Sequence, residues 1–170
     1  MADHNNSADK PRVDVDVPDL PVIVHAQYVK DFSFENPNAP TVLRPSKARP
    51  EMDINILLDA SRIPDDQNPD LYESALTLSI KATREGQVVF ICEIIYAALI
   101  SIKNAPPERI NPILYVDVPA MIFPFARQLV ATATAAGGIP PLYLNPIDFR
   151  GMYLSQKREQ KQPVEVSGAA

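Results

Sequence analysis

Few residues in this sequence have the types and spacing that catalysis requires. The 170 residues include one cysteine and two histidines, which excludes a disulfide framework and a multi-cysteine zinc site. Cys92 lies at an apolar strand position, where a buried structural thiol is expected. His25 lies on a polar strand face, and Asp65 and Asp66 lie in a proline-flanked loop, so all three are expected to be solvated. No GxSxG, HExxH, CxxC or glycine-rich phosphate loop occurs, and we predict no catalytic residues, metal or cofactor.

Carboxylates instead gather at strand positions of equal parity. Asp31 and Glu35 share one strand face, about 13 Å apart at about 3.3 Å per residue. By the same counting, Ile91 and Glu93 lie on the outward face of a later strand. A basic partner would meet three carboxylates beside an apolar side chain, and an ordinary solvated sheet face is the alternative.

Apolar side chains form a second candidate surface, between the second strand and the last helix. If the helix leans over the strand, they line an apolar groove suited to extended peptide segments, and the alternative is plain core. The groove candidates are Met52, Ile54, Ile56, Phe149, Met152 and Tyr153.

Alternating apolar and polar residues predict four strands that position these side chains. The strands cover residues 22–34, 52–60, 71–83 and 89–99. A tight turn at 84–87 predicts that the last two form a hairpin. The fourth strand is apolar on both sides, which indicates cover on both sides, one of them by another subunit.

The C-terminal half predicts a long connection and two helices. Residues 101–118 contain three prolines and are expected to lack regular structure. A helix over 119–136 is apolar nearly all round, which again implies a subunit interface, and Gly137 ends it. Asn145 is expected to cap a second helix, with Pro146 in its first position and Asp148 in its first turn.

Composition limits the class of protein. The formal net charge is −5, from 16 basic and 21 acidic residues, which argues against nucleic acid as a partner. No run approaches about 18 apolar residues and no secretory signal opens the chain, so we expect a cytoplasmic protein with no membrane insertion. We predict a flexible acidic arm over 1–21, with an edge strand at 13–17 as the alternative, one domain over 22–159, and a flexible tail over 160–170.

Four strings occur in a fixed order and carry a resemblance: YVKDFSFENPNAP, FICEI, FPFARQLV and GGIPPLYLNPIDF. With this order and spacing, residues 27–153 resemble the SecB family of protein-export chaperones. The resemblance implies an α+β fold, a four-stranded antiparallel sheet with two helices packed on one face, assembling as a dimer of dimers. It implies a non-enzymatic homotetramer that holds unfolded precursor proteins and delivers them to the SecA ATPase.

The resemblance also implies roles for individual residues. Asp31, Glu35, Ile91 and Glu93 match the SecA-binding surface, with Ile91 in place of the usual leucine. Groove positions match Met52, Ile54, Ile56 and Tyr153. The expected tetramer interface is formed by Cys92, Ile94 and Tyr96, together with Phe123 and Arg127 of the first helix.

Two other functions are compatible with the same sequence. One is a SecB-like chaperone for a toxin–antitoxin or other non-export client, which client capture would distinguish. The other is a small-ligand or thioester enzyme on an α+β oligomer, which would need a positioned acid, base or nucleophile that the sequence does not offer.

Overall fold

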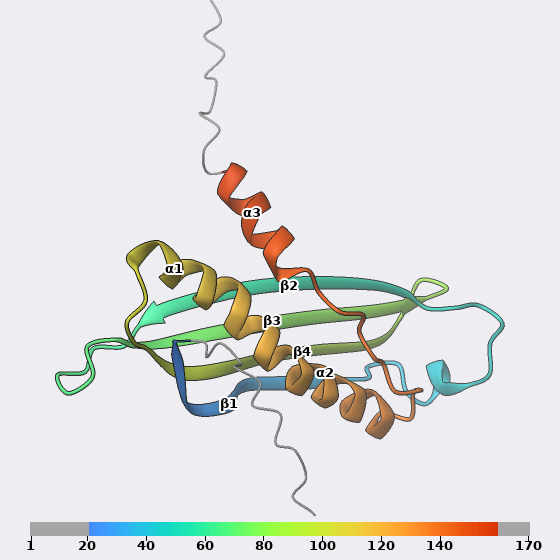
Figure 1. Cartoon of the computed structure of the whole chain (residues 1–170). Coiled ribbons are helices and arrows are strands. Elements are labelled where there is room, and N and C mark those ends of the chain that lie inside the picture. Colours follow the sequence, from blue (N-terminus) through green and yellow to red (C-terminus); the bar gives the residue numbers. More distant parts are fainter. Residues whose placement is uncertain (1–20, 160–170) are drawn as a thin grey trace, which may run out of the picture.

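A single antiparallel sheet and one helix lying across it form the body of the protein. A computed structural model describes residues 21–159. The strands are β1 (Val22–Glu35), β2 (Glu51–Arg62), β3 (Leu71–Arg84) and β4 (Gln87–Ile102), in the order β1-β4-β3-β2. The predicted four-stranded sheet is thus confirmed (Figure 1). So is the hairpin between β3 and β4, which turns through Glu85 and Gly86, both at positive φ.

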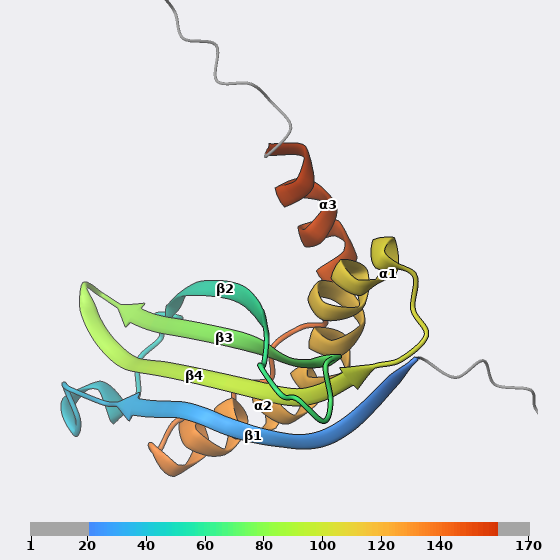
Figure 2. The ribbon, with the colours of Figure 1, turned by 90° about the vertical axis from the view of Figure 1, so that its left-hand side faces the viewer.

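The core lies between the inner face of the sheet and helix α2 (Val118–Ala136), which packs on β4 and β3. Alternate side chains of these two strands point toward α2 and are buried, among them Leu78 and Phe90. Ile122 and Val130 of α2 meet them. Figure 2 shows α2 on one face of the sheet only, so the other face is open. The inner sides of the edge strands β1 and β2 are left partly uncovered.

Two bulges in β1 change which face of the sheet some of its residues occupy, relative to the simple alternation predicted. The register shifts between Val24 and Ala26 and again between Val29 and Asp31. Between the shifts, Tyr28 lies opposite Ala97 on the outer face. Lys30, expected as an exception on the apolar side, instead forms an ion pair with Glu73 of β3. A bulge inserts one unpaired residue, and this reverses the parity of the strand.

The connection after β4 is helical, and the expectation of an unstructured segment over 101–118 is wrong. Helix α1 (Pro107–Pro112) and a π-helical turn (Ile113–Asp117) lead directly into α2. Prolines are accommodated because Pro107 lies at the start of α1, where its missing N–H costs nothing. In a π-helix each carbonyl accepts the N–H of the residue five positions later, but the residue five positions after Leu114 is Pro119, which has no N–H. The buried Ser74 hydroxyl donates to the Leu114 carbonyl at 2.8 Å in its place.

This continuous run, Pro107–Ala136, is long and apolar enough to cross a membrane by length and composition, which the sequence analysis did not expect. Its apolar side covers the sheet, as core helices do. Three exposed positions on its outer side, Pro124, Phe125 and Gln128, are uncharged.

Helix α3 (Phe149–Glu159) begins three residues later than predicted and extends away from the sheet (Figure 1). Asp148, not Asn145, caps it, because its Oδ1 accepts the Gly151 N–H at 2.9 Å. Phe149 packs edge-to-face on Phe123 at 5.9 Å. Only the first turns of α3 carry apolar residues, and the rest of the helix is polar. The helix therefore has no continuous apolar side that would hold it against β2, where it was expected to lie.

The end of α2 is tied to the connection that follows it by one buried threonine. The Thr134 hydroxyl donates to the Val130 carbonyl at 2.9 Å and accepts the Leu142 N–H at 3.0 Å. The Ile139 N–H bonds the Thr134 carbonyl at 3.0 Å. Thr134 therefore fixes the path of residues 138–142 against the body of the protein.

We expect Thr134→Val to lower the free energy of unfolding by about 1 kcal/mol, since the Leu142 N–H loses its acceptor while side-chain shape is kept. Thr132→Val is the matched control, because Thr132 is exposed and its hydroxyl bonds only within α2. It should change stability by less than about 0.5 kcal/mol. Urea unfolding of both variants measures the difference, and equal effects would contradict the role given to Thr134.

Candidate functional site

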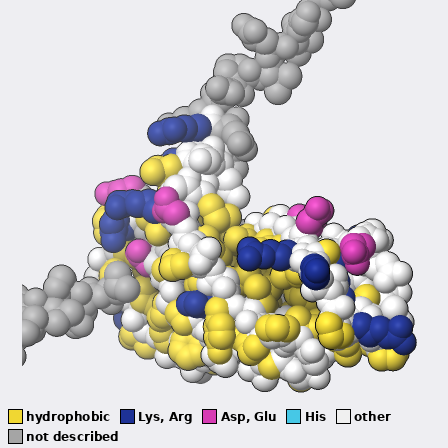
Figure 3. All heavy atoms as spheres, turned by 90° about the vertical axis from the view of Figure 1, so that its right-hand side faces the viewer, with side chains coloured by type: hydrophobic (Ala, Val, Ile, Leu, Met, Phe, Trp, Pro, Cys, Tyr) yellow, Lys and Arg dark blue, Asp and Glu magenta, His cyan; other side chains and the backbone are white. Residues whose placement is uncertain are grey.

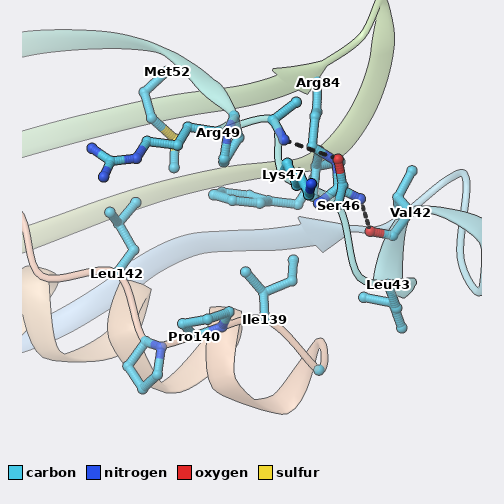
Figure 4. A pocket seen from close by; sticks show the side chains of 16 residues that line it. Val42, Leu43, Ser46, Lys47, Arg49, Met52, Arg84, Ile139, Pro140 and Leu142 are labelled. Carbon is cyan, nitrogen blue, oxygen red and sulfur yellow. Dashed lines mark hydrogen bonds between the residues drawn. The ribbon is translucent and has the colours of Figure 1, made fainter.

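A hollow opens where β2 and β4 begin and β3 ends. Its volume is about 620 Å³. Figure 3 shows a predominantly apolar surface here with basic side chains over it, and Figure 4 shows its lining. We call this hollow the groove. Its lining residues are Val42, Leu43, Ser46, Lys47, Ala48, Arg49, Pro50, Met52, Arg84, Val89, Phe90, Gly138, Ile139, Pro140, Pro141 and Leu142.

The first wall is the segment between β1 and β2, which contains a 3-10 turn at Thr41–Leu43. Its position is fixed by hydrogen bonds to the β3–β4 hairpin. The Arg84 guanidinium donates to the Val42 carbonyl, and Asn38 Nδ2 donates to the Val88 carbonyl at 3.0 Å. Val42 is buried, whereas Leu43 is 40% exposed. The wall thus has a fixed base and an apolar rim.

The second wall is the proline-rich connection after α2, and a glycine allows it to approach β1. A Cβ on Gly137 would lie 2.6 Å from the ring of Phe34, so any side chain there would force the ring to move. Asn36 Nδ2 donates to the Gly137 carbonyl at 3.2 Å. Gly138 follows at a φ of +77°, a conformation that favours glycine. These contacts present Ile139 and Leu142 toward the hollow (Figure 4).

The structure separates the six predicted groove residues into two groups. Met52 lines the groove, and Ile54 and Ile56 continue along the inner side of β2. Met52 and Ile54 are 39% and 43% exposed. An apolar strip therefore leads from the groove along an edge strand whose outer backbone groups have no neighbouring strand within the described chain.

The other three lie at the start of α3, apart from the groove. Phe149 is buried in the core, so it does not line a surface as predicted. Met152 packs against the core, and the ring of Tyr153 stacks on that of Tyr115 at 6.3 Å. Sequence reasoning missed both walls of the groove. Their one signal was the pair of proline-interrupted apolar segments, 40–50 and 139–142, which neither helix nor strand periodicity explained.

The predicted carboxylates do come together on the outer face of the sheet. Glu35 lies opposite Ile91, Ser33 opposite Glu93, and Asp31 opposite Ile95. Opposed residues of an antiparallel pair have Cβ atoms about 5 Å apart, so Glu93 lies between the two acids of β1. Ser79 of β3 donates to Glu93 Oε1 at 3.0 Å. We call the cluster of Asp31, Glu35, Ile91 and Glu93 the acidic face.

A hydrogen-bonded network lies farther along the same outer side. Glu73 accepts from the Tyr28 hydroxyl at 2.6 Å and from Lys30. These two donors hold the pKa of the Glu73 carboxyl below its usual value. Burial, together with the negative Glu73, raises the pKa of Tyr28 to about 12. The network ties β1 to β3 across β4, and its one carboxylate forms an ion pair, whereas those of the acidic face form none with residues 21–159.

Most of the residues expected at a tetramer interface lie inside the protomer. Cys92 and Ile94 are fully buried on the inner face, and Phe123 is also buried. Tyr96 is 9% exposed and its ring stacks on Phe125 of α2 at 6.2 Å. Parity therefore placed Cys92 inward as predicted, and α2 of the same chain covers this inner face. Burial raises the pKa of the Cys92 thiol to about 11.

The remaining residue of that set, Arg127, is half-buried on α2. Its guanidinium carbon lies 5.6 Å from the centroid of the Tyr143 ring, within cation–π range. Its buried Nε has no hydrogen-bond partner within the described chain.

Known proteins are similar to this chain over most of its length. The family described as Preprotein translocase subunit SecB matches residues 16–160. Protein-export protein SecB of Bartonella quintana is 44% identical over 145 residues, which cover 82% of this chain and 89% of the relative. Its counterpart in Rhodospirillum centenum is 41% identical over 151 residues, 88% of each chain.

A solved structure shares the fold at low sequence identity. It is a SecB-like chaperone of Mycobacterium tuberculosis in complex with a ChAD peptide from an antitoxin, with a TM-score of 0.60 and 15% identity, covering 74% of this chain and 90% of that one. At this identity the likeness concerns the fold alone. On the family match and the identities to its relatives, the chain belongs to the SecB family of preprotein translocase subunits.

Proposed function

We propose that this protein is a cytoplasmic export chaperone that binds unfolded precursor proteins in the groove and keeps them competent for translocation. The observation that carries the proposal is the apolar groove of about 620 Å³ that continues into the exposed inner side of β2. Apolar contact contributes about 25 cal/mol per Å² buried, so several hundred Å² would offset the ordering of an extended chain without reading its sequence.

The edge position of β2 supports binding of extended segments. No strand within residues 21–159 pairs with its outer side, so its backbone groups there offer hydrogen bonds to an added strand, while Met52 and Ile54 offer apolar contact. Chains that fold quickly hide their apolar segments before capture, and slowly folding precursors do not. Selection of clients would thus be kinetic.

Delivery to SecA is assigned to the acidic face. Its three carboxylates surround an apolar residue and lie on the opposite side of the sheet from the groove. A basic, partly apolar element of SecA would fit this pattern. Because the two surfaces are separate, a loaded client need not block the encounter with SecA.

Assembly as a dimer of dimers is supported by apolar surface that one protomer leaves uncovered. Val24, Val29 and Phe32 of the edge strand β1 are each at least 40% exposed, as is Phe125 on the uncharged outer side of α2. Contiguous apolar patches of this kind mark interaction sites. Several grooves on one particle would then hold a single client by avidity.

Two alternatives remain distinguishable. A chaperone of toxin–antitoxin clients would capture an antitoxin rather than export precursors, and the mycobacterial SecB-like chaperone is in complex with a peptide from an antitoxin. A thioester or small-ligand enzyme would turn over an acyl substrate. Among residues 21–159, no three His, Cys, Asp or Glu side chains are placed to hold a metal ion.

We expect Ile54→Asn to weaken binding of an unfolded precursor about fivefold, because it removes apolar contact beside the groove. Leu57→Asn is the matched control: Leu57 lies on the same strand, faces the other side of the sheet and is 56% exposed. It should leave client affinity unchanged. Fluorescence anisotropy with a labelled precursor measures both, with light scattering to verify assembly. Equal loss in the two variants would remove the support for the groove.

We expect Glu93→Lys to weaken SecA binding at least fivefold at low salt while client affinity is kept, because one attraction becomes a repulsion. Asp59→Lys makes the same change of charge on the outer side of β2, away from the acidic face, and should have a smaller effect. Titration of labelled SecA at two salt concentrations measures this. A parallel loss of client binding would indicate misfolding rather than a lost docking contact.

A further inference from the structure

Three rows of side chains cross the outer face of the sheet, and each row takes one residue from every strand. The strand registers define the rows, because residues opposite one another in neighbouring strands point to the same side. In the order β1, β4, β3, β2, the first row is Glu35, Ile91, Lys81 and Asp53, the second is Ser33, Glu93, Ser79 and Asn55, and the third is Asp31, Ile95, Thr77 and Leu57. Rows lie about 7 Å apart and neighbouring strands about 4.8 Å apart, so this grid measures about 14 Å in each direction.

On β1 and β4 the grid is symmetric about its second row, where Glu93 lies. On either side of Glu93, a carboxylate of β1 lies opposite an isoleucine of β4. Glu35 lies opposite Ile91 at one end, and Asp31 lies opposite Ile95 at the other. A basic partner that recognises a carboxylate beside an apolar side chain would therefore find two similar places, one at each end of the acidic face.

The residues of β3 break this symmetry. Lys81 lies opposite Ile91, in the row that contains Glu35, whereas Thr77 has the same place in the row of Asp31. Lys81 is exposed, and it forms no ion pair within residues 21–159. One end of the acidic face thus has an unpaired cation beside it, and the other end has a neutral hydroxyl group.

Neighbouring charges do not cancel this difference. Asp53 lies opposite Lys81 but two strand spacings from Ile91, about 9.6 Å, while Lys81 is one spacing away, about 4.8 Å. Because the Coulomb energy falls with distance, Asp53 offsets part of the Lys81 charge at Ile91 and not all of it. Near the other end of the face, the charge of Lys30 is balanced by its ion pair with Glu73.

We infer that Lys81 directs a basic partner to the Asp31 end of the acidic face. This inference rests on the proposed delivery to SecA and adds where on the face its basic element lies. A partner cation at the Glu35 end would lie within about 7 Å of Lys81. At that distance the repulsion of two like charges in water changes affinity about threefold. Lys81 is thus a specificity-determining residue, and Asp31 contributes more to SecA affinity than Glu35 does.

Neutral variants of the two carboxylates test the inference on the full-length protein. Asp31→Asn should weaken SecA binding about fivefold at low salt, and Glu35→Gln about twofold. Titration of labelled SecA measures both losses. At about 0.5 M salt the two losses should converge, because exposed charges are then screened. Affinity for an unfolded precursor should stay unchanged in both variants, which verifies that the fold is kept.

Exchange of the two β3 residues locates the effect. The double variant Lys81→Thr with Thr77→Lys keeps the composition and net charge of the chain and moves the cation into the row of Asp31. In this background the order should reverse, so that Glu35→Gln costs more SecA affinity than Asp31→Asn. Lys81→Thr alone should tighten SecA binding about threefold and bring the two losses within about 1.5-fold of each other.

Lys103→Gln is the control for the change of net charge in Lys81→Thr. Lys103 is exposed and follows the end of β4, about 40 Å along the strand from Ile91. Its loss should change SecA affinity by less than about 1.5-fold. An increase as large as that of Lys81→Thr would show that overall charge, and not the position of Lys81, sets the affinity, and would overturn the inference.

The remaining outcomes separate the inference from the function on which it rests. If Glu35→Gln costs as much SecA affinity as Asp31→Asn, or if the order persists after the exchange, the role given to Lys81 is wrong and delivery through the acidic face stands. If SecA binds equally well to the Glu93→Lys variant, the proposed docking at the acidic face itself fails.

Discussion

One helix cannot cover four strands. The strands of a sheet lie about 4.8 Å apart, so the outer two are separated by about 14 Å, while a helix with its side chains is about 10 Å across. In this protein α2 covers β4 and β3, and the inner sides of β1 and β2 stay partly open. The exposed apolar residues on both edges follow from this mismatch. In our proposal the exposed apolar residues of β1 support assembly, and those of β2 lead into the groove.

Charge divides the molecule in a second way. Parity along the strands sends carboxylates to the outer face, and the segments that build the groove contribute cations. The two register shifts in β1 cancel, so Asp31 and Glu35 lie beside Glu93 on the outer face, the side that simple alternation gives them. Only the residues between the shifts, such as Tyr28, change side.

Hydrophobic periodicity predicted the strands and the helix that have a regular pattern, and it missed the segments that have none. Alternation of apolar and polar residues predicted the four strands, and an apolar segment that ends at Gly137 predicted α2. Strand parity predicted the inward position of Cys92. Sequence patterns did not predict that residues 107–117 are helical, because this depends on a π turn and on Ser74, which is distant in the sequence. The groove walls depend on contacts such as that between Phe34 and Gly137, which no local pattern encodes. Capping by Asp148 rather than Asn145 is likewise a choice between two plausible residues that tertiary packing decides.

The buried cysteine has a consequence for a protein that handles unfolded chains. Cys92 is fully covered, and its pKa of about 11 keeps the sulfur protonated at neutral pH. Disulfide exchange requires an accessible thiolate. Precursors destined for oxidising compartments carry reduced thiols while they wait, and this protein presents no reactive sulfur to them. Captured polypeptides can therefore leave without a covalent tether to their carrier.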